Sequence, residues 1–376
     1  MQTVLHRSGS ERGAILVHVA VALLMLVALS AFTVDRGMYW VGRGQSQNSA
    51  DAGAIAGAIA LAYDSATDTS DTGPAKLSAW TTARANLVVD KLPAINVTDD
   101  ITFVDCPDGT AAPACIRVDV YRDLAHGNAL PTWFGNLVGL TSQDTRATAT
   151  AEAGGANATN CLRPWMVPDK WSEVTPPSAT FNGADVYTTP DPETGLGGTG
   201  YTVKNDYGTV ITLHPGNPKD AIVPSDYYDI DLGDSKGGHD YRNNIVNCTQ
   251  QTEGFGDVVQ TLPGHDVGNT KKGVADLIAR DPYAYWDPVK KQIVDSAYGV
   301  SPRIVPIALF SPAEFMGLDR KSGVINLHIV NLLGFFVQTT DGKDIQGVLI
   351  SIPGELIAGA TVGPAASFIK YIQLVR

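Results

Sequence analysis

The chain opens with a long apolar stretch that carries no charge. Residues 14–34 read AILVHVAVALLMLVALSAFTV and contain no Asp, Glu, Lys or Arg. As a helix, about 21 residues extend roughly 31 Å, which matches the hydrocarbon core of a bilayer. The Leu, Ile, Val and Phe side chains together favour insertion by about 4–7 kcal/mol. We therefore expect one transmembrane helix at residues 14–34, preceded by a cytoplasmic tail at residues 1–13.

A cleaved signal peptide is the alternative interpretation of this stretch, because Arg7 and Arg12 precede it as a basic region would. The apolar run is longer than a signal-peptide core, however. It also continues to Tyr39 and Trp40, which are placed like aromatic anchors at a membrane surface. A retained helix is favoured. The flanking charges do not fix its orientation, so the N-in orientation rests on the cysteines and acidic body that follow.

The residues after the apolar stretch predict that the helix continues. Residues 45–63 are rich in Ala, the best helix former. Small residues recur along one face, and a GxxxG pair there lets another backbone approach closely. The residues that we expect to form this helix–helix contact are Ala50, Gly53, Ala54 and Gly57. Either the chain's own sheet or a second copy of the helix could cover this face, and the sequence leaves both open.

Periodicity then predicts a small α+β region over residues 35–153. A helix is expected at residues 76–91 and a short one around 132–140, with strands at 95–104, 116–121 and 145–153. Apolar and polar residues alternate in the 116–121 segment, as they do in a sheet with one buried face. The expected arrangement is a long, pilin-like helix packed on a small antiparallel sheet.

The remaining chain predicts a second, mostly β domain. Residues 154–160, GGANATN, have the composition of a linker. Residues 161–376 are rich in Gly, Pro, Asn and Asp, and Thr270 is placed to cap a helix that runs to Arg280. Strands are predicted at 211–213, 304–310, 324–330, 334–338, 347–352 and 368–375. The fold class is therefore α+β, with a transmembrane helix, a pilin-like region and a β-rich C-terminal domain.

Charge and cysteine usage narrow the functions. A net charge of -12 opposes binding to nucleic acid, so we expect no nucleic-acid partner. No Cys or His residues have zinc-ligand spacing, and we expect no metal and no cofactor. The cysteines favour disulfides, which form in oxidising compartments. The local pairing joins Cys106 to Cys115 and leaves Cys161 with Cys248, and it is one of three possible pairings.

One motif imitates a hydrolase. Residues 233–237, GDSKG, fit GxSxG, and His239 or His265 with Asp240 or Asp266 could complete a triad on paper. A nucleophile elbow follows a strand that is buried on both faces, whereas the preceding DYYDIDL segment alternates as a half-exposed strand does. We therefore expect no catalytic residues and no enzymatic activity.

Three stretches carry a resemblance to a known family. Glu11, Arg12 and Gly13 precede the apolar run, VDRG closes it at residues 34–37, and QNSADAGAIAGA follows at residues 47–58. In this combination the first 60 residues or so resemble the TadE/TadG-like proteins of the tight-adherence (Flp) pilus system, and the resemblance continues weakly to residue 153. The segments CLRPWMVPDKW, YRNNIVNC and VGNTKKGVADLIARDP are similar to the C-terminal region of longer TadG-type proteins.

The resemblance implies a non-enzymatic, membrane-anchored pseudopilin-like or assembly component of the bacterial inner membrane. Its N-terminus would be cytoplasmic and its C-terminal domain periplasmic. Its partners would be membrane lipid and other pilus assembly proteins or pseudopilins. A membrane-tethered periplasmic hydrolase and a surface adhesin are the alternatives.

The sequence departs from the pilin pattern at one position. Pilin precursors of this broad class are cut after a glycine and need a glutamate five residues later. The fifth residue after Gly13 is His18. We therefore expect the helix to be retained uncut.

Overall fold

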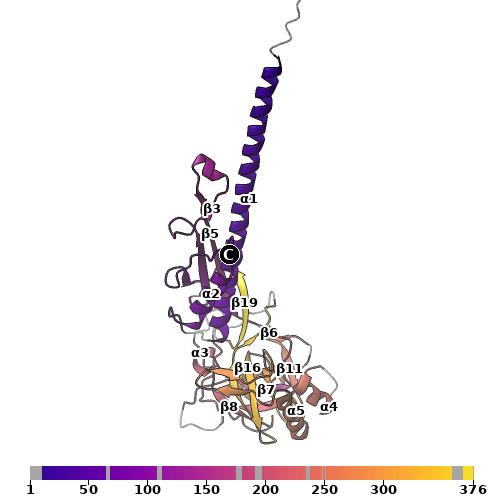
Figure 1. Ribbon diagram of the computed structural model, residues 1–376. Helices are drawn as coiled ribbons and strands as arrows, with labels where there is room; N and C mark the ends of the chain where they lie inside the picture. Colours follow the sequence, from indigo (N-terminus) through magenta and orange to yellow (C-terminus); the bar gives the residue numbers. More distant parts are fainter. Residues whose placement is uncertain are drawn as a thin grey trace, which may run out of the picture.

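One helix dominates the shape of the molecule. The computed structural model describes residues 11–64, 68–107, 112–174, 180–190, 197–233, 238–247, 249, 251–357 and 367–375. Helix α1 runs without a break over Glu11–Tyr63, a length of about 80 Å at 1.5 Å per residue. In Figure 1 its first half projects alone and its second half lies against the rest of the chain. The predicted mixture of a long N-terminal helix with a β-rich body is confirmed.

The second half of α1 packs on a helix and a sheet. Helix α2 (Pro74–Ala85) lies along α1, and the sheet has the order β1-β2-β5-β19-β18. Every neighbouring pair is antiparallel except β18 and β19, which are parallel. The strands of this sheet are β1 (Ile101–Val104), β2 (Cys115–Arg122), β5 (Thr145–Gly155), β18 (Ile352–Pro353) and β19 (Ile369–Val375). Alternate alanines of β5 are buried under α1, and these small side chains allow the helix to approach the sheet closely.

A narrow hairpin extends from this sheet along α1. It consists of β3 (Leu130–Pro131), the 3-10 helix η1 (Gly135–Val138) and β4 (Ser142–Gln143). Strands β3 and β4 are antiparallel. Figure 1 shows its tip beside the projecting half of α1, beyond the end of the sheet.

The second part of the chain is built around a barrel. Among the described residues, six strands close in the order β9-β7-β14-β16-β17-β8, because β8 also pairs with β9. Two of these pairings are parallel, β7 with β14 and β8 with β9. The barrel strands are β7 (Trp165–Pro168), β8 (Val210–Pro215), β9 (Asp226–Asp231), β14 (Ile304–Phe310), β16 (Asn331–Thr340) and β17 (Ile345–Ile350). Strands β11 (Val258–Thr261) and β15 (Asn326–His328) continue the sheet beyond β9.

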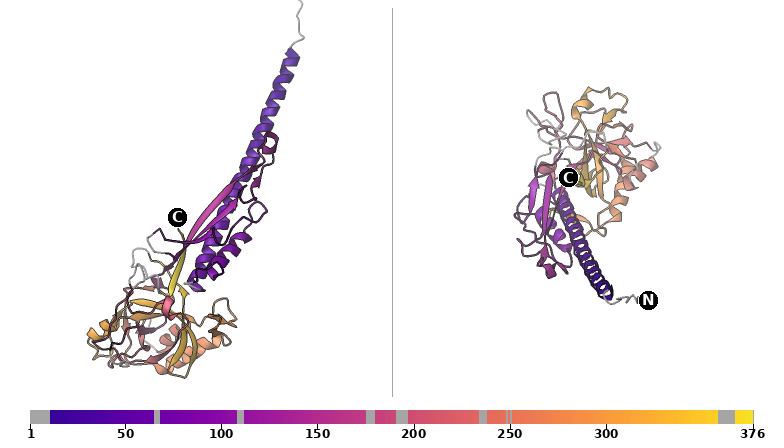
Figure 2. Two further views of the ribbon diagram at one scale, coloured as in Figure 1. Left: turned by 90° about the vertical axis from the view of Figure 1, so that its left-hand side faces the viewer. Right: turned by 90° about the horizontal axis from the view of Figure 1, so that it is seen from above.

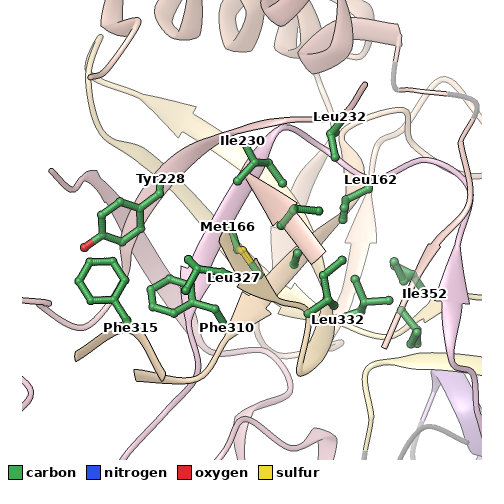
Figure 3. Packing of buried hydrophobic residues seen from close by; sticks show 14 of the residues in the cluster. Leu162, Met166, Tyr228, Ile230, Leu232, Phe310, Phe315, Leu327, Leu332 and Ile352 are labelled. Carbon is green, nitrogen blue, oxygen red and sulfur yellow. The ribbon is translucent and has the colours of Figure 1, made fainter. Parts of the chain in front are cut away.

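Alternate side chains of the barrel strands serve two cores on opposite faces of the wall. On β14, Val305, Ile307 and Leu309 enter one core, while Ala308 and Phe310 enter the other. Figure 3 shows the second core, where the ring of Phe310 lies among neighbouring aromatic and aliphatic side chains. Burial on both faces explains why the barrel strands are continuous apolar runs.

Short helices and strands complete the body. The helices are α3 (Val203–Asp206), α4 (Gly238–Asn247), α5 (Val267–Arg280) and α6 (Pro312–Gly317). The remaining strands are β6 (Ala158–Thr159), β10 (Glu253–Gly254), β12 (Tyr285–Asp287) and β13 (Gln292–Val294). Helices α4 and α5 pack on each other, and they contribute buried side chains to the same core as β16.

The two parts share strands, which corrects the predicted division of the chain. Residues 154–160 are not a linker: Gly154 and Gly155 end β5 and pair with β19, and residues 156–159 are buried. The C-terminal domain therefore does not comprise all of 161–376, because β18 and β19 complete the first sheet. Figure 2 shows β19 passing from the barrel to that sheet.

Local boundaries also differ from the prediction. The helix predicted at 76–91 spans Pro74–Ala85 instead. Its C-cap, Asn86, is extended, and Val89 and Asp90 adopt positive φ angles of 48° and 58° in the turn that follows. The strand predicted at 304–310 is confirmed as β14.

Candidate functional site

The first half of α1 presents a bare apolar surface. The large hydrophobic side chains of residues 15–34 are between 45% and 73% exposed. Among the described residues, α1 is the one helix that is long and apolar enough to cross a membrane. Exposure of apolar surface to water costs about 25 cal/mol of free energy per Å², and this cost is removed in the interior of a bilayer.

The hairpin is fastened to α1 where this surface ends. The Asp35 side chain is only 9% exposed, and its carboxylate accepts hydrogen bonds from three consecutive backbone N–H groups of the hairpin. Oδ1 lies 2.8 Å from the nitrogen of Trp133, and Oδ2 lies 3.1 Å and 2.6 Å from those of Phe134 and Gly135. These groups begin η1 and have no partner within it, so the carboxylate satisfies them.

A second contact lies two turns further along the same face of α1. Leu130 at the start of β3 is buried, and its side chain occupies the place where a Cβ at Gly42 would stand, 2.5 Å from Cδ1. A larger residue at position 42 would push the hairpin away. Asp35 and Gly42 together fix the hairpin on α1, and sequence analysis assigned neither of them this role.

The predicted small-residue face is covered by the chain itself. Ala50 and Ala54 are fully buried. A Cβ built at Gly53 would lie 2.8 Å from the Cβ of Ala83 on α2, and one at Gly57 would lie 2.7 Å from Cδ1 of Ile116 on β2. The structure therefore places the four predicted contact residues against α2 and the first sheet. In this arrangement the face is not available to a second copy of the helix.

The disulfide between Cys106 and Cys115 is confirmed. It closes the connection between β1 and β2, with a Cα–Cα distance of 5.4 Å. Cys161 is also disulfide-bonded. Cys248, which the local pairing assigned to it, lies outside the described residues.

Polar contacts hold β19 in the first sheet. Glu152 on β5 is buried, and its carboxylate oxygens accept hydrogen bonds from Tyr371 Oη at 2.8 Å and Gln373 Nε2 at 3.0 Å. Lys370 on β19 is buried, and this burial lowers its pKa to about 8. At the end of α1, Tyr207 Oη donates to the carbonyl oxygen of Tyr63 at 3.2 Å. The Glu152 contacts thus hold β19 against β5, and the Tyr207 contact joins the end of α1 to the second part of the chain.

The hydrolase motif falls partly outside the described residues, which exclude 234–237 and so Ser235. The DYYDIDL segment was wrongly interpreted as half-exposed. Its residues 226–231 form β9. Asp229 is buried there, and its carboxylate accepts hydrogen bonds from Tyr241 Oη and from the backbone nitrogen of Asp266. Burial raises the pKa of Asp229 to about 6, although these two donors lower it.

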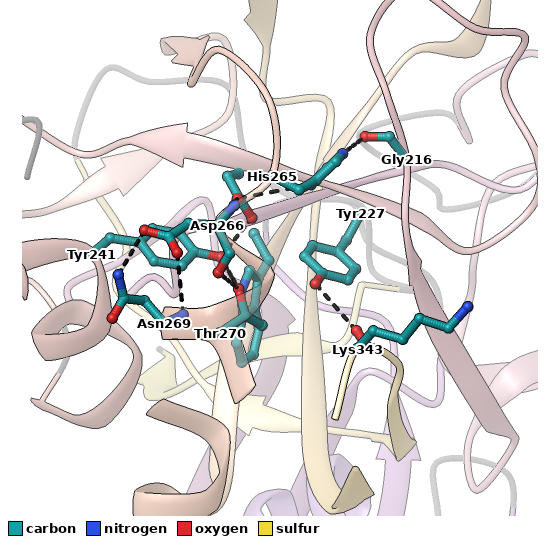
Figure 4. A network of polar contacts seen from close by, with 10 residues as sticks. Gly216, Tyr227, Tyr241, His265, Asp266, Asn269, Thr270 and Lys343 are labelled. Carbon is teal, nitrogen blue, oxygen red and sulfur yellow. Dashed lines mark hydrogen bonds and ion pairs between the residues drawn. The ribbon is translucent and has the colours of Figure 1, made fainter. Parts of the chain in front are cut away.

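The triad candidates have structural contacts (Figure 4). His265 Nε2 is hydrogen-bonded to the carbonyl oxygen of Gly216, and burial lowers the pKa of the imidazole ring. Asp266 caps α5 by accepting from the nitrogen of Asn269 at 3.1 Å. The predicted cap, Thr270, lies inside the helix and donates its hydroxyl to the carbonyl oxygen of Asp266.

The other two candidates are at the start of α4. The His239 side chain is 93% exposed, and its Nδ1 lies 3.4 Å from Oδ1 of Asp240. Within the described parts of the chain, no group of three or more His, Cys, Asp or Glu side chains could hold a metal ion.

The long helix carries the family signal. Residues 13–60 match the Tad family, described as "Putative Flp pilus-assembly TadE/G-like". No curated protein and no solved structure matches the chain. The Tad match lies entirely within α1, and it includes the exposed apolar half, Asp35 and the covered small-residue face. A pilus-related role is therefore supported, and a Tad domain suggests interaction with other pilus components. The resemblance of the region after Cys161 to TadG-type proteins stays a prediction.

Proposed function

We propose that this chain is a non-enzymatic, membrane-anchored component of Tad/Flp-type pilus assembly. Residues 14–34 cross the inner membrane, and the sheet and barrel stand in the periplasm. The observation that carries the proposal is the division of α1 into two halves. The first half, residues 15–34, is apolar and exposed, and we call it the bare half. The second half packs against α2 and the first sheet, and the Tad match includes residues of both halves.

The division of α1 supports a retained anchor. The helix continues without a break from the bare half into the packed half. A membrane that holds the bare half would therefore also hold the body rigidly. About 30 Å of bare apolar helix fits one bilayer.

The disulfides support a body on the periplasmic side of the membrane. Cys106, Cys115 and Cys161 are all disulfide-bonded. Disulfides persist in the bacterial periplasm and are rare in the cytosol. The disulfides therefore support a body outside the cytoplasm and an N-terminus inside it.

The contacts of α1 limit how it meets other pilus proteins. The small residues that could pack against another helix are already covered by α2 and the sheet. Lateral contacts with pseudopilins therefore use the bare half, inside the bilayer, or the surfaces of the body. The role is pseudopilin-like: the first half of α1 lies in the bilayer, and the second half of α1 carries the sheet and the barrel.

The test is deletion of the gene in its host, followed by complementation and counting of pili by electron microscopy. Pili should be lost, and they should be restored by the wild-type chain and equally by Ser235→Ala. Failure of Ser235→Ala at normal protein level would favour the tethered hydrolase. Normal pili with lost surface attachment would favour the adhesin.

A further inference from the structure

The hairpin exposes apolar side chains at its tip, beside the projecting half of α1. Residues 127–143, GNALPTWFGNLVGLTSQ, contain no charged side chain. At the tip, the side chains of Trp133, Leu137 and Leu140 are 68%, 82% and 64% exposed. Exposed large apolar residues that cluster in this way mark an interaction surface.

The position of the tip along α1 is fixed by contacts. Asp35 accepts the backbone N–H groups of residues 133–135, and it directly follows the apolar span. Within residues 15–34, Ala31 is the one residue that is half-buried, and the others are exposed. It lies one turn before Asp35 on the same face. The tip therefore overlaps the last turn of the apolar span.

Several backbone groups of the tip are hydrogen-bonded within it. The N–H of Leu140 donates to the carbonyl oxygen of Gly135 at 2.9 Å, and that of Leu137 donates to Phe134 at 3.0 Å. The hydroxyl of Thr132 donates to the carbonyl oxygen of Leu140. Together with the bonds to Asp35, these contacts leave the tip suited to a place with little water, where each unpaired backbone group costs several kcal/mol.

The surroundings at this level fit a membrane interface. Tyr39 and Trp40 lie one turn beyond Asp35, and the Arg36 guanidinium carbon is 5.2 Å and 5.6 Å from their ring centroids. Aromatic rings and arginines at this depth meet the headgroup region, where arginine contacts phosphate.

We propose that the tip of the hairpin, residues 132–141, enters the periplasmic leaflet of the same bilayer that α1 crosses. Its occupant is lipid, at the boundary of headgroups and acyl chains, because the apolar tip is continuous with the lipid-facing surface of α1. The proposal rests on the proposed function in that residues 14–34 are in the bilayer. With two attachments, α1 and the tip, the body cannot rotate freely about the helix axis.

The test is depth-dependent quenching of tryptophan in the full-length chain. The protein is reconstituted into phosphatidylcholine and phosphatidylglycerol vesicles, with or without phosphatidylcholine brominated on the acyl chain close to the headgroup. The contribution of each tryptophan is the wild-type emission minus that of a Phe variant. Trp133→Phe reports the tip, Trp40→Phe the exit of α1, and Trp80→Phe the body as a matched control.

We expect brominated lipid to remove more than half of the emission of Trp133 and a comparable share from Trp40, while the emission of Trp80 is unchanged. Quenching of Trp40 without Trp133 would overturn the hairpin proposal and leave the anchor intact, with the tip in water or against protein. Absence of quenching at both positions would overturn the anchor as well.

A second set of variants distinguishes an effect of the apolar tip from an unspecific effect of replacing exposed leucines by serine. Leu137→Ser with Leu140→Ser should reduce the quenching of Trp133 several-fold. Leu124→Ser, at an equally exposed position before the hairpin, should leave it unchanged. An undiminished signal in the double variant would contradict insertion through the tip.

Discussion

Replacing Gly53 by alanine tests how closely α1 and α2 are packed. The added Cβ would lie 2.8 Å from the Cβ of Ala83 and 3.0 Å from the carbonyl oxygen of Ala79. Neither atom is at the end of a flexible side chain. The two helices must therefore move apart to admit the methyl group.

Two opposing effects set the magnitude. Alanine is preferred to glycine inside a helix by about 0.8–1.0 kcal/mol. Forcing a methyl group into a packed core costs about 1–3 kcal/mol, and the rigid neighbours of Gly53 favour the upper part of this range. Gly53→Ala should therefore lower the free energy of unfolding by about 1–2 kcal/mol.

Gly44 supplies the matched control, because it lies in the same helix with nothing within 4 Å of an added Cβ. Gly44→Ala should gain the helix preference alone, about 0.8–1.0 kcal/mol. The assay is thermal unfolding of the full-length chain in mild detergent, followed by circular dichroism. Each kcal/mol moves the midpoint by about 2–4 °C in a domain of this size. Shifts of the same sign in both variants would refute the close packing of α2 on Gly53.

Further predictions concern Lys370, the disulfide between Cys106 and Cys115, and Asp35. The pKa of Lys370 is about 8 in the folded chain and about 10.4 when unfolded, so the unfolded chain binds more protons in this window. Stability should rise by about 1–2 kcal/mol from pH 8 to 9.5 in denaturant titrations, and Lys370→Met should abolish the rise; an equal rise in the variant would contradict the assignment. Replacing Cys106 and Cys115 together by alanine should cost about 2.7 kcal/mol by loop entropy, and an unchanged midpoint would exclude a stabilising role. Asp35→Ala should release the hairpin, so that limited proteolysis cuts beside Trp133 sooner than in wild type, and an unaltered cleavage pattern would count against the carboxylate contacts.

The sequence predicted the parts of the fold that depend on local pattern. The apolar run at residues 14–34 needs no distant partner, and β14 was placed at its observed bounds because a continuous apolar strand is a local signal. The linker prediction failed at Gly154. This glycine makes room for the ring of Tyr371, which stands where a Cβ would be. Its partner strand is more than 200 residues away in the sequence. Without knowledge of that partner, the Gly- and Asn-rich composition of residues 154–160 indicates a flexible linker.

The candidate site was predictable only in part. The membrane span and the small residues of α1 follow from spacing, but the partner of the small-residue face was left open between the chain itself and a second copy. Asp35 resembled an ordinary charge flanking a membrane helix. Its contact with backbone N–H groups of residues 133–135 depends on a hairpin about 100 positions away, and no pattern around Asp35 indicates it.

The most direct test of the central claim is protease treatment of intact spheroplasts that produce the full-length chain with an N-terminal epitope tag, followed by alkaline carbonate extraction. We expect the body to be digested from outside, while a short tagged fragment is protected and stays in the membrane. Survival of the full-length chain in intact spheroplasts, or its release by carbonate, would contradict a helix at residues 14–34 that holds the body in the periplasm.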